Sequence, residues 1–278
     1  MDQVDYINGQ TRLYGIVGDP IVQVRSPEMV THALQGRGLN AILVPLHVAR
    51  ADFARVVPQL MQLHNLDGLV VTIPYKTQAL SLAHSLGLQA QAVGALNALA
   101  RRRDGTWAGD MFDGMGCVQA FARRGFALRD RSVLLIGLGG AGSAIAAAVA
   151  SEHPLRMHIW DLDPDRCRQS AAVIARLSPS TQVHVGPPHL DGVDVLMNAS
   201  PVGMLKDARL PLVADALPPG LVVFDTIVYP EQTPLLQLAR RSGCQVVTGR
   251  EMMQGQIARI VDFFIQAQQG TANPVVDR

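Results

Sequence analysis

A glycine-rich segment at residues 133–142, with the sequence VLLIGLGGAG, constrains the fold more than any other part of the chain. Its first four residues are apolar and predict a buried strand, its glycines predict a tight turn, and residues 143–150 predict an alanine-rich helix. Glycine lets the backbone approach a ligand closely, and the free N–H groups at the start of a helix attract an anion. We therefore expect the pyrophosphate of a dinucleotide to bind at Gly137, Gly139, Gly140, Ala141 and Gly142.

An acidic residue follows at the distance that a dinucleotide site requires. Residues 157–160 predict a second strand, and Asp161 ends it, 24 residues after Gly137. A carboxylate at about 20 residues accepts hydrogen bonds from the adenine ribose hydroxyls and repels a 2′-phosphate. We therefore expect NAD rather than NADP as the cofactor, although Arg166 and Arg168 lie nearby in the sequence. The alternative is a domain of the same fold that binds no dinucleotide.

The composition excludes several classes of protein. The 278 residues are 48% hydrophobic and 17% charged, which suits two folded domains. A net charge of +1 gives no reason to expect nucleic acid or a membrane surface as a partner, and no apolar run reaches the roughly 18 residues of a membrane span. Three widely spaced cysteines favour a reducing, cytoplasmic setting without a disulfide framework. The eight histidines show no metal-ligand spacing, so we expect no metal site.

Strands alternate with helices along the whole chain, and this pattern predicts an α/β protein of two domains. We place a substrate-binding and catalytic α/β domain at 1–113 and a Rossmann dinucleotide-binding domain at 114–248. Residues 249–278 are expected to hold a long C-terminal helix, about 251–268, that packs back on the first domain. The remaining predicted strands lie at 13–18, 41–46, 66–73, 182–185, 193–198, 221–226 and 245–247. The remaining predicted helices lie at 26–35, 52–63, 74 onward, 115–124, 164–177 and 234–242, and a hairpin turns at Asp104-Gly105.

Four polar residues of the first domain are candidates for chemistry. Lys76 directly follows a predicted strand, at a predicted helix start, where the helix dipole disfavours a second positive charge and suits the lysine to proton transfer. Asp113 lies at the domain junction, where ligands bind, although it is equally suited to cap the next helix. Asn97 and Thr72 are expected to point toward the same cleft, but Asn97 also fits a turn.

Six ordered motifs together resemble the shikimate/quinate dehydrogenase family over nearly the whole chain. Each would be weak evidence alone, and their order makes them specific. They are YGIVGDPI at 14–21 with Ser26-Pro27, TIPYK at 72–76, GALN at 94–97, GDMFDG at 109–114, NASPVGM at 198–204, and Gln256 of the last helix.

The resemblance implies a dehydrogenase with Lys76 and Asp113 as its catalytic pair. The lysine would move the proton of the substrate hydroxyl, the aspartate would hold both groups, and hydride would pass between the substrate carbon and the nicotinamide. Ser26 would bind the carboxylate of a cyclic hydroxy acid such as shikimate or quinate. Thr72, Asn97 and Gln256 would bind its ring hydroxyls. The further residues implied at the cofactor, beyond the glycine turn and Asp161, are Ser200, Gly203, Met204 and Gly249.

Four positions depart from the family pattern and remove polar groups near the expected substrate. Val24 replaces the first serine of a Ser-x-Ser motif, Val70 an asparagine, Phe112 a threonine and Val228 a tyrosine. Each unpaired buried partner costs roughly 1–3 kcal/mol, so shikimate itself is expected to bind less well. The open alternatives are an enzyme for a less polar cyclic alcohol, a metabolite sensor without turnover, and a dehydrogenase of another class, such as a folate dehydrogenase. We expect a monomer or a homodimer.

Overall fold

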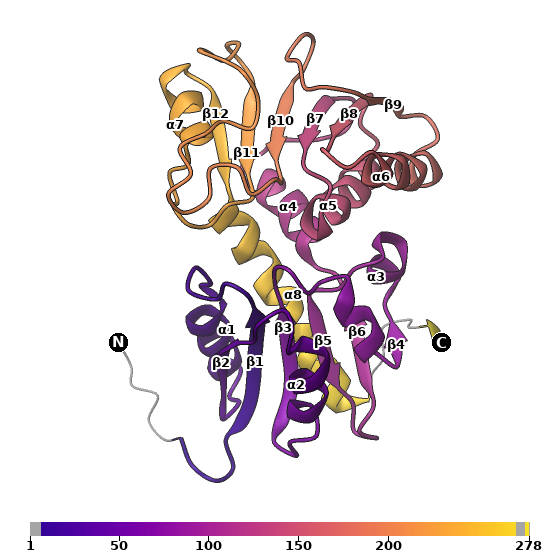
Figure 1. Ribbon diagram of the computed structural model, residues 1–278, viewed down its shortest axis with the longest axis vertical. Helices are drawn as coiled ribbons and strands as arrows, with labels where there is room; N and C mark the ends of the chain where they lie inside the picture. Colours follow the sequence, from indigo (N-terminus) through magenta and orange to yellow (C-terminus); the bar gives the residue numbers. More distant parts are fainter. Residues whose placement is uncertain (1–6, 271–275, 278) are drawn as a thin grey trace. The chain divides into compact units, whose positions relative to one another are not determined.

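The computed structural model describes residues 7–270 and 276–277, and it has the predicted α/β architecture (Figure 1). The chain forms two compact units. The first contains Met1–Phe112 with Ile257–Arg278, and the second contains Asp113–Gln256. Among the described residues, no helix has both the length and the apolar character needed to cross a membrane.

The first unit is built on a mixed seven-stranded sheet in the order β13-β4-β6-β5-β3-β1-β2. Strands β1, β2 and β3 are parallel, whereas β5 runs antiparallel to both β3 and β6. Its strands are β1 (Arg12–Gly18), β2 (Ala41–His47), β3 (Leu66–Val71), β4 (Ser85–Leu86), β5 (Ala98–Arg101), β6 (Trp107–Asp110) and β13 (Val276–Asp277). Its helices are α1 (Ser26–Gln35), α2 (Phe53–Leu60), α3 (Leu88–Val93) and the 3₁₀ helix η1 (Gln78–Leu82).

The second unit is a fully parallel six-stranded sheet in the order β12-β11-β10-β7-β8-β9. In chain order this is the doubly wound arrangement, in which the direction of winding reverses between β7 and β10. Its strands are β7 (Ser132–Ile136), β8 (Arg156–Trp160), β9 (Gln182–Val185), β10 (Val195–Asn198), β11 (Val222–Asp225) and β12 (Gln245–Thr248). Its helices are α4 (Asp113–Arg123), α5 (Gly140–Ser151), α6 (Pro164–Leu177) and α7 (Pro234–Arg241).

Alternate residues of the central strand β7 pack into two different hydrophobic cores. Val133 and Leu135 pack with residues of α4, α5 and α6, such as Phe121 and Ile145. Leu134 and Ile136 pack on the opposite face with residues of α7. A strand that is buried on both faces is apolar without alternation, which explains why the run VLLI precedes the glycine turn.

The last helix, α8 (Gly249–Gln269), is continuous, and the two units share it. In the second unit, Gly116 of α4 and Gly255 of α8 allow the two backbones to meet, since a Cβ on Gly116 would lie 2.6 Å from the carbonyl oxygen of Met252. In the first unit, the ring of Phe264 packs on Tyr14, with centroids 4.8 Å apart, and a Cβ on Gly68 would lie 2.7 Å from that ring.

Several predicted boundaries were wrong. The strand expected to reach residue 73 ends at Val71, and no α-helix begins at residue 74, because a turn leads instead to the short 3₁₀ helix η1. The helix predicted at 26–35 is confirmed as α1, with Ser26 as its first residue and Arg25 at the cap position. The helix expected from 143 begins at Gly140, so Gly140 and Gly142 lie in its first turn. The hairpin turn at Asp104 is confirmed, because its carboxylate accepts the backbone N–H of Thr106 at 2.9 Å.

Candidate functional site

The glycine turn lies where the winding of the six-stranded sheet reverses. Gly137 directly follows β7 and has a φ of +92°, which favours glycine. A Cβ at this residue would lie 2.5 Å from the backbone nitrogen of Ser200, which follows β10. The loops after β7 and β10 therefore meet at the point where open α/β sheets bind ligands.

Different physical factors explain why glycine stands at the other two fingerprint positions, 142 and 139. A Cβ on Gly142 would overlap the carbonyl oxygen of Gly137, so this glycine is required for the close packing of α5 on the turn. No protein atom lies within 4 Å of a Cβ placed on Gly139, which is the N-cap of α5 and makes no side-chain cap. The protein itself therefore does not require glycine there, and the open space lies beside the unpaired N–H groups of the first helical turn, at Gly140, Ala141 and Gly142. This arrangement fits an approaching pyrophosphate.

Asp161 directly follows β8 and is tied to the same turn. Its carboxylate accepts the backbone N–H of Leu138 at 2.7 Å and that of Asp163 at 2.9 Å. The guanidinium of Arg166, which is half exposed, lies 3.7 Å from the same carboxylate. Asp161 therefore stabilises the glycine turn itself, in addition to being in the position expected of a ribose ligand.

A buried polar network supports the loops after β10 and β11. The side-chain oxygen of Asn198 accepts the Ser200 hydroxyl at 2.7 Å, and its amide donates to the Asp225 carboxylate at 3.2 Å. Asp225, fully buried, also accepts the Thr233 hydroxyl at 2.7 Å and the Ile227 backbone N–H at 3.1 Å. The residues expected at the cofactor are therefore supported by the buried carboxylate of Asp225.

Three further predicted cofactor residues lie around this network. Gly203 is buried with a φ of +96°, and a Cβ on it would lie 3.7 Å from the side chain of Ile227. The backbone N–H of Met204 donates to the carbonyl of Pro201 at 3.1 Å, which closes a turn. A Cβ on Gly249, at the start of α8, would lie 2.6 Å from the Ile227 carbonyl oxygen. The ends of β10, β11 and β12 thus converge near Ile227.

We expect this network to make the free energy of unfolding depend on pH. Burial raises the pKa of Asp225 to about 6, against the opposing effect of its hydrogen bonds from Thr233, Ile227 and Asn198. Because the folded state then holds the proton more tightly than the unfolded state, the free energy of unfolding decreases as the pH rises from about 4 to above 6, by on the order of 2–3 kcal/mol. Asp225→Asn keeps the shape of the side chain but does not titrate. We therefore expect the free energy of unfolding of this variant not to show this decrease.

Urea denaturation at pH 4.5 and 7 measures the effect as the difference between the wild type and Asp225→Asn, which cancels the titration of every other group. An equal pH dependence in both proteins would contradict the assignment to Asp225.

Lys76, Thr72 and Asn97 come from neighbouring chain segments of the first unit. The backbone N–H of Val71 donates to the carbonyl of Asn97 at 2.8 Å, and that of Leu96 donates to the carbonyl of Lys76 at 2.9 Å. The structure therefore brings these segments together. Lys76 is half-buried in a turn rather than at the start of an α-helix, so the argument from a helix dipole is removed. Its role in proton transfer depends on the family resemblance alone.

Asn97 and Thr72 also have structural roles. The side-chain oxygen of Asn97, which is 2% exposed, accepts the backbone N–H of Phe112 at 2.9 Å. The methyl group of Thr72 packs where a side chain on Gly18 would otherwise lie. The side chains of Thr72 and Ser26 are both half-buried.

Two of the departures from the family pattern are buried in apolar surroundings. Val70 is a buried residue near the end of β3, and Phe112 packs on Phe263 of α8 with ring centroids 5.4 Å apart. Val24 and Val228 are half-buried. The substituted side chains at 70 and 112 therefore contribute to the core of the first unit.

Asp113 and Gln256 lie in the second unit, on the crossing helices α4 and α8. Asp113 is the first residue of α4 and is 3% exposed. The Cβ of Gln256 lies 3.0 Å from the position of a Cβ on Gly116, one turn into α4. Asp113 also lies four residues before Cys117, whose pKa is raised by burial and, to a smaller extent, by the nearby carboxylate.

Comparison with known proteins places both units in one family. Residues 16–99 match the model described as the shikimate dehydrogenase substrate binding domain. The chain is 33% identical over 251 residues to a shikimate dehydrogenase (NADP(+)) of Jannaschia sp. (strain CCS1), with 88% of each chain covered.

Solved structures show the same relationship. A shikimate 5-dehydrogenase from Listeria monocytogenes, in complex with shikimate and NAD, has a TM-score of 0.81 at 26% identity, covering 97% of this chain and 96% of that one. A quinate dehydrogenase from Corynebacterium glutamicum, in complex with NAD, has a TM-score of 0.80 at 25% identity, covering 91% and 93%. Because the similarity extends over both units and their glycine turn, the chain belongs to the shikimate/quinate dehydrogenase family of oxidoreductases.

Proposed function

We propose that this protein is a dehydrogenase that transfers hydride between a nicotinamide dinucleotide and a cyclic hydroxy acid of the shikimate or quinate type. One observation carries the proposal: the glycine turn of Gly137 and Gly142 lies at the reversal point of a fully parallel sheet. The family membership supplies the substrate class, because the similar proteins are named for shikimate and quinate. In this proposal residues 1–113 form the substrate domain, 114–248 the dinucleotide domain, and 249–278 the returning helix.

The residues of the second unit would hold the cofactor. The first-turn N–H groups of α5 face the pyrophosphate, and Asp161 accepts hydrogen bonds from the adenine ribose. Ser200, Gly203, Met204 and Gly249 line the nicotinamide side. A bound nicotinamide dinucleotide accepts the hydride during oxidation of the substrate and supplies it during reduction.

The residues of the first unit, with Asp113 and Gln256, would hold the substrate and move its proton. In the oxidation direction, Lys76 accepts the proton of the substrate hydroxyl as the hydride leaves the same carbon, and it passes that proton to water. The Asp113 carboxylate orients the lysine ammonium and the hydroxyl. Ser26 binds the substrate carboxylate. The groups that bind the ring hydroxyls are Thr72, Asn97 and Gln256.

Asp161 favours NAD over NADP in this proposal. The Asp161 carboxylate would repel a 2′-phosphate, whereas ribose hydroxyls can donate hydrogen bonds to it. The relatives favour NADP, since curated ones such as the Jannaschia protein are NADP(+) enzymes, and solved structures of shikimate dehydrogenases hold NADP as well as NAD. The preference for NAD proposed for this chain therefore depends on Asp161, the residue that follows β8.

We expect Asp161→Asn to lower the preference for NAD over NADP by about tenfold, the effect of about 1.4 kcal/mol of removed repulsion. The measurement is kcat/KM for both cofactors at saturating substrate. A ratio within one variant cancels any loss of folded protein caused by weakening the hydrogen bonds to Leu138 and Asp163. A wild type that prefers NADP, with the same ratio in Asp161→Asn, would overturn the assignment.

A less polar substrate is the second candidate, and the buried Val70 and Phe112 favour it. Initial rates of NAD and NADP reduction with shikimate and with quinate test the proposal. Turnover with either acid supports it. Dinucleotide binding without such turnover would point to a less polar cyclic alcohol as substrate, or to a metabolite sensor if such alcohols also fail.

A further inference from the structure

A hollow of about 380 Å³ lies on the six-stranded sheet of the second unit. Ser132, Arg156 and Gln182, the first residues of β7, β8 and β9, line it. The proposed dinucleotide site lies at the opposite, carboxyl ends of the same strands. The hollow is therefore a separate feature of the fold.

The hollow lies where the connection from β9 to β10 lacks a helix. β9 and β10 are joined by residues 186–194 alone. Met157 and Ile159 point into the core that contains α5 and α6, so His158, between them, points to the other face of β8. The irregular connection covers that face at the edge of the sheet.

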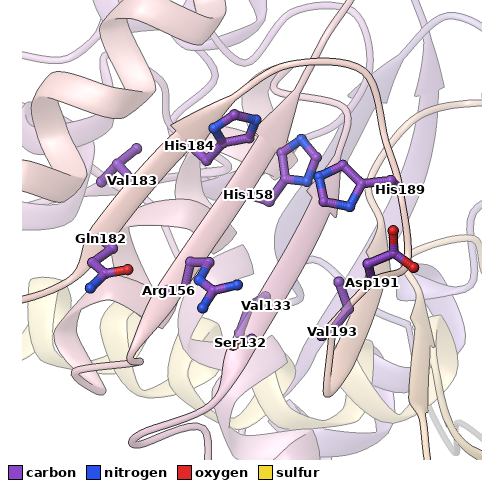
Figure 2. Close-up of a pocket in the computed structure, with 11 residues that line it drawn as sticks. Ser132, Val133, Arg156, His158, Gln182, Val183, His184, His189, Asp191 and Val193 are labelled. Atoms are coloured by element: carbon purple, nitrogen blue, oxygen red, sulfur yellow. The ribbon is translucent and has the colours of Figure 1, made fainter.

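Three histidine side chains meet in the hollow. His158 of β8 and His184 of β9 are direct neighbours in the parallel register, and His189 comes from the connection. The ring centroid of His158 lies 4.7 Å from that of His184 and 4.6 Å from that of His189. One ring nitrogen from each residue lies within 4.8 Å of those of the other two. Figure 2 shows the three rings turned toward one another.

His158 is the residue that most clearly indicates a ligand site. It is 3% exposed, and its Nε2 lies 2.9 Å from the carbonyl oxygen of Gly186. A carbonyl only accepts, so Nε2 carries the hydrogen and Nδ1 carries a lone pair. This Nδ1 is buried and has no hydrogen-bond partner among the described residues. A histidine whose second nitrogen donates to a backbone carbonyl is the usual arrangement of a metal ligand.

We propose that His158, His184 and His189 bind one divalent transition-metal ion of the zinc class. Neutral imidazoles suit Zn²⁺, Ni²⁺ and Cu²⁺, whereas Mg²⁺ and Ca²⁺ prefer oxygen ligands. Tetrahedral Zn–N bonds of 2.0–2.1 Å place the nitrogens roughly 3.4 Å apart. The exposed rings of His184 and His189 reach that spacing by rotating.

The charged groups of the hollow determine the net charge around the proposed ion and its remaining ligand. Among the described residues that line it, Asp191 is the only carboxylate, and its charge is opposite to that of Arg156, which lines it as well. Water or Asp191 completes the coordination. The ion links the edge strand β9 and the 186–194 connection to β8, so its role is structural and separate from hydride transfer.

The test uses the full-length protein without a polyhistidine tag, freed of metal with a chelator. Calorimetric titration with ZnCl₂ is expected to give one ion per chain, and Co²⁺ is expected to give the visible absorption of a tetrahedral complex. Zn²⁺ is expected to raise the melting temperature. We expect His184→Ala and His189→Ala each to weaken zinc binding by about tenfold or more.

The matched control is His64→Ala, which removes an exposed histidine of the first unit and is expected to leave zinc binding unchanged. Both test residues are exposed, so the variants are expected to fold, and circular dichroism verifies this. Failure of the wild type to bind zinc, or equal binding by the wild type and both variants, would overturn the proposal.

Discussion

Lys76→Ala is expected to lower kcat for the hydroxy acid by 10²- to 10⁴-fold, the usual contribution of a positioned proton-transfer group. The residues proposed to hold the dinucleotide lie in the second unit, so the affinity for NAD is expected to be unchanged. Steady-state rates and fluorescence titration with NADH measure the two effects separately. A metabolite sensor would bind its ligand equally well with and without Lys76.

The chain offers two controls for this experiment. It contains only two lysines among its 24 basic residues, and the other, Lys206, is exposed. Lys206→Ala is expected to leave kcat near the wild-type value. Lys76→Arg keeps the positive charge but cannot release a proton, so it is expected to be as inactive as Lys76→Ala. Activity of Lys76→Arg near that of the wild type would show that charge alone is needed.

Gly137→Ala is expected to lower the free energy of unfolding by roughly 2–5 kcal/mol. A side chain at a φ of +92° is strained by about 1–2 kcal/mol, and overpacking adds about 1–3 kcal/mol. The Cβ would lie 2.5 Å from the Ser200 nitrogen, and that segment cannot shift cheaply, because the Ser200 N–H donates to Asn198 and the Ala199 N–H donates to Ile136. Urea denaturation measures the loss.

Gly105→Ala separates strain from steric overlap. Gly105 has a φ of +84°, similar to that of Gly137, but no atom lies within 4 Å of its Cβ position. Its replacement is therefore expected to cost only the strain. Equal losses of stability in the two variants would contradict the proposed overlap with Ser200. Gly139→Ala, which also has open space, is expected to remain stable while binding the dinucleotide less tightly.

Local sequence patterns were sufficient to predict much of the fold. The run VLLI, the glycine turn and Asp161 lie where the sequence placed them, because strand, turn and helix signals are local and here agree with one another. The turn at Asp104 was predicted for the same reason. The start of α5 was placed too late, since glycine disfavours helix interiors but is tolerated in the first turn.

Features that depend on distant segments were not predictable. The role of Asp225 as a buried acceptor depends on Asn198 and Thr233, which only the packed sheet brings to it. The histidine cluster depends on the register of β8 against β9, which pairs His158 with His184 across 26 residues of sequence. The prediction of an α-helix at Lys76 was wrong, because a turn and a 3₁₀ helix occupy this segment.

The shared helix α8 gives the two units different folding histories. The second unit is continuous in sequence, so all its residues are present once Gln256 has been made. Most of the first unit is made before the second, yet Phe264 covers Gly68 and Tyr14 only after the whole second unit has been synthesised. On the ribosome, where domains fold as they emerge, the sheet of the first unit has this face uncovered until α8 appears. Of the two units, the one whose synthesis starts first is therefore completed second.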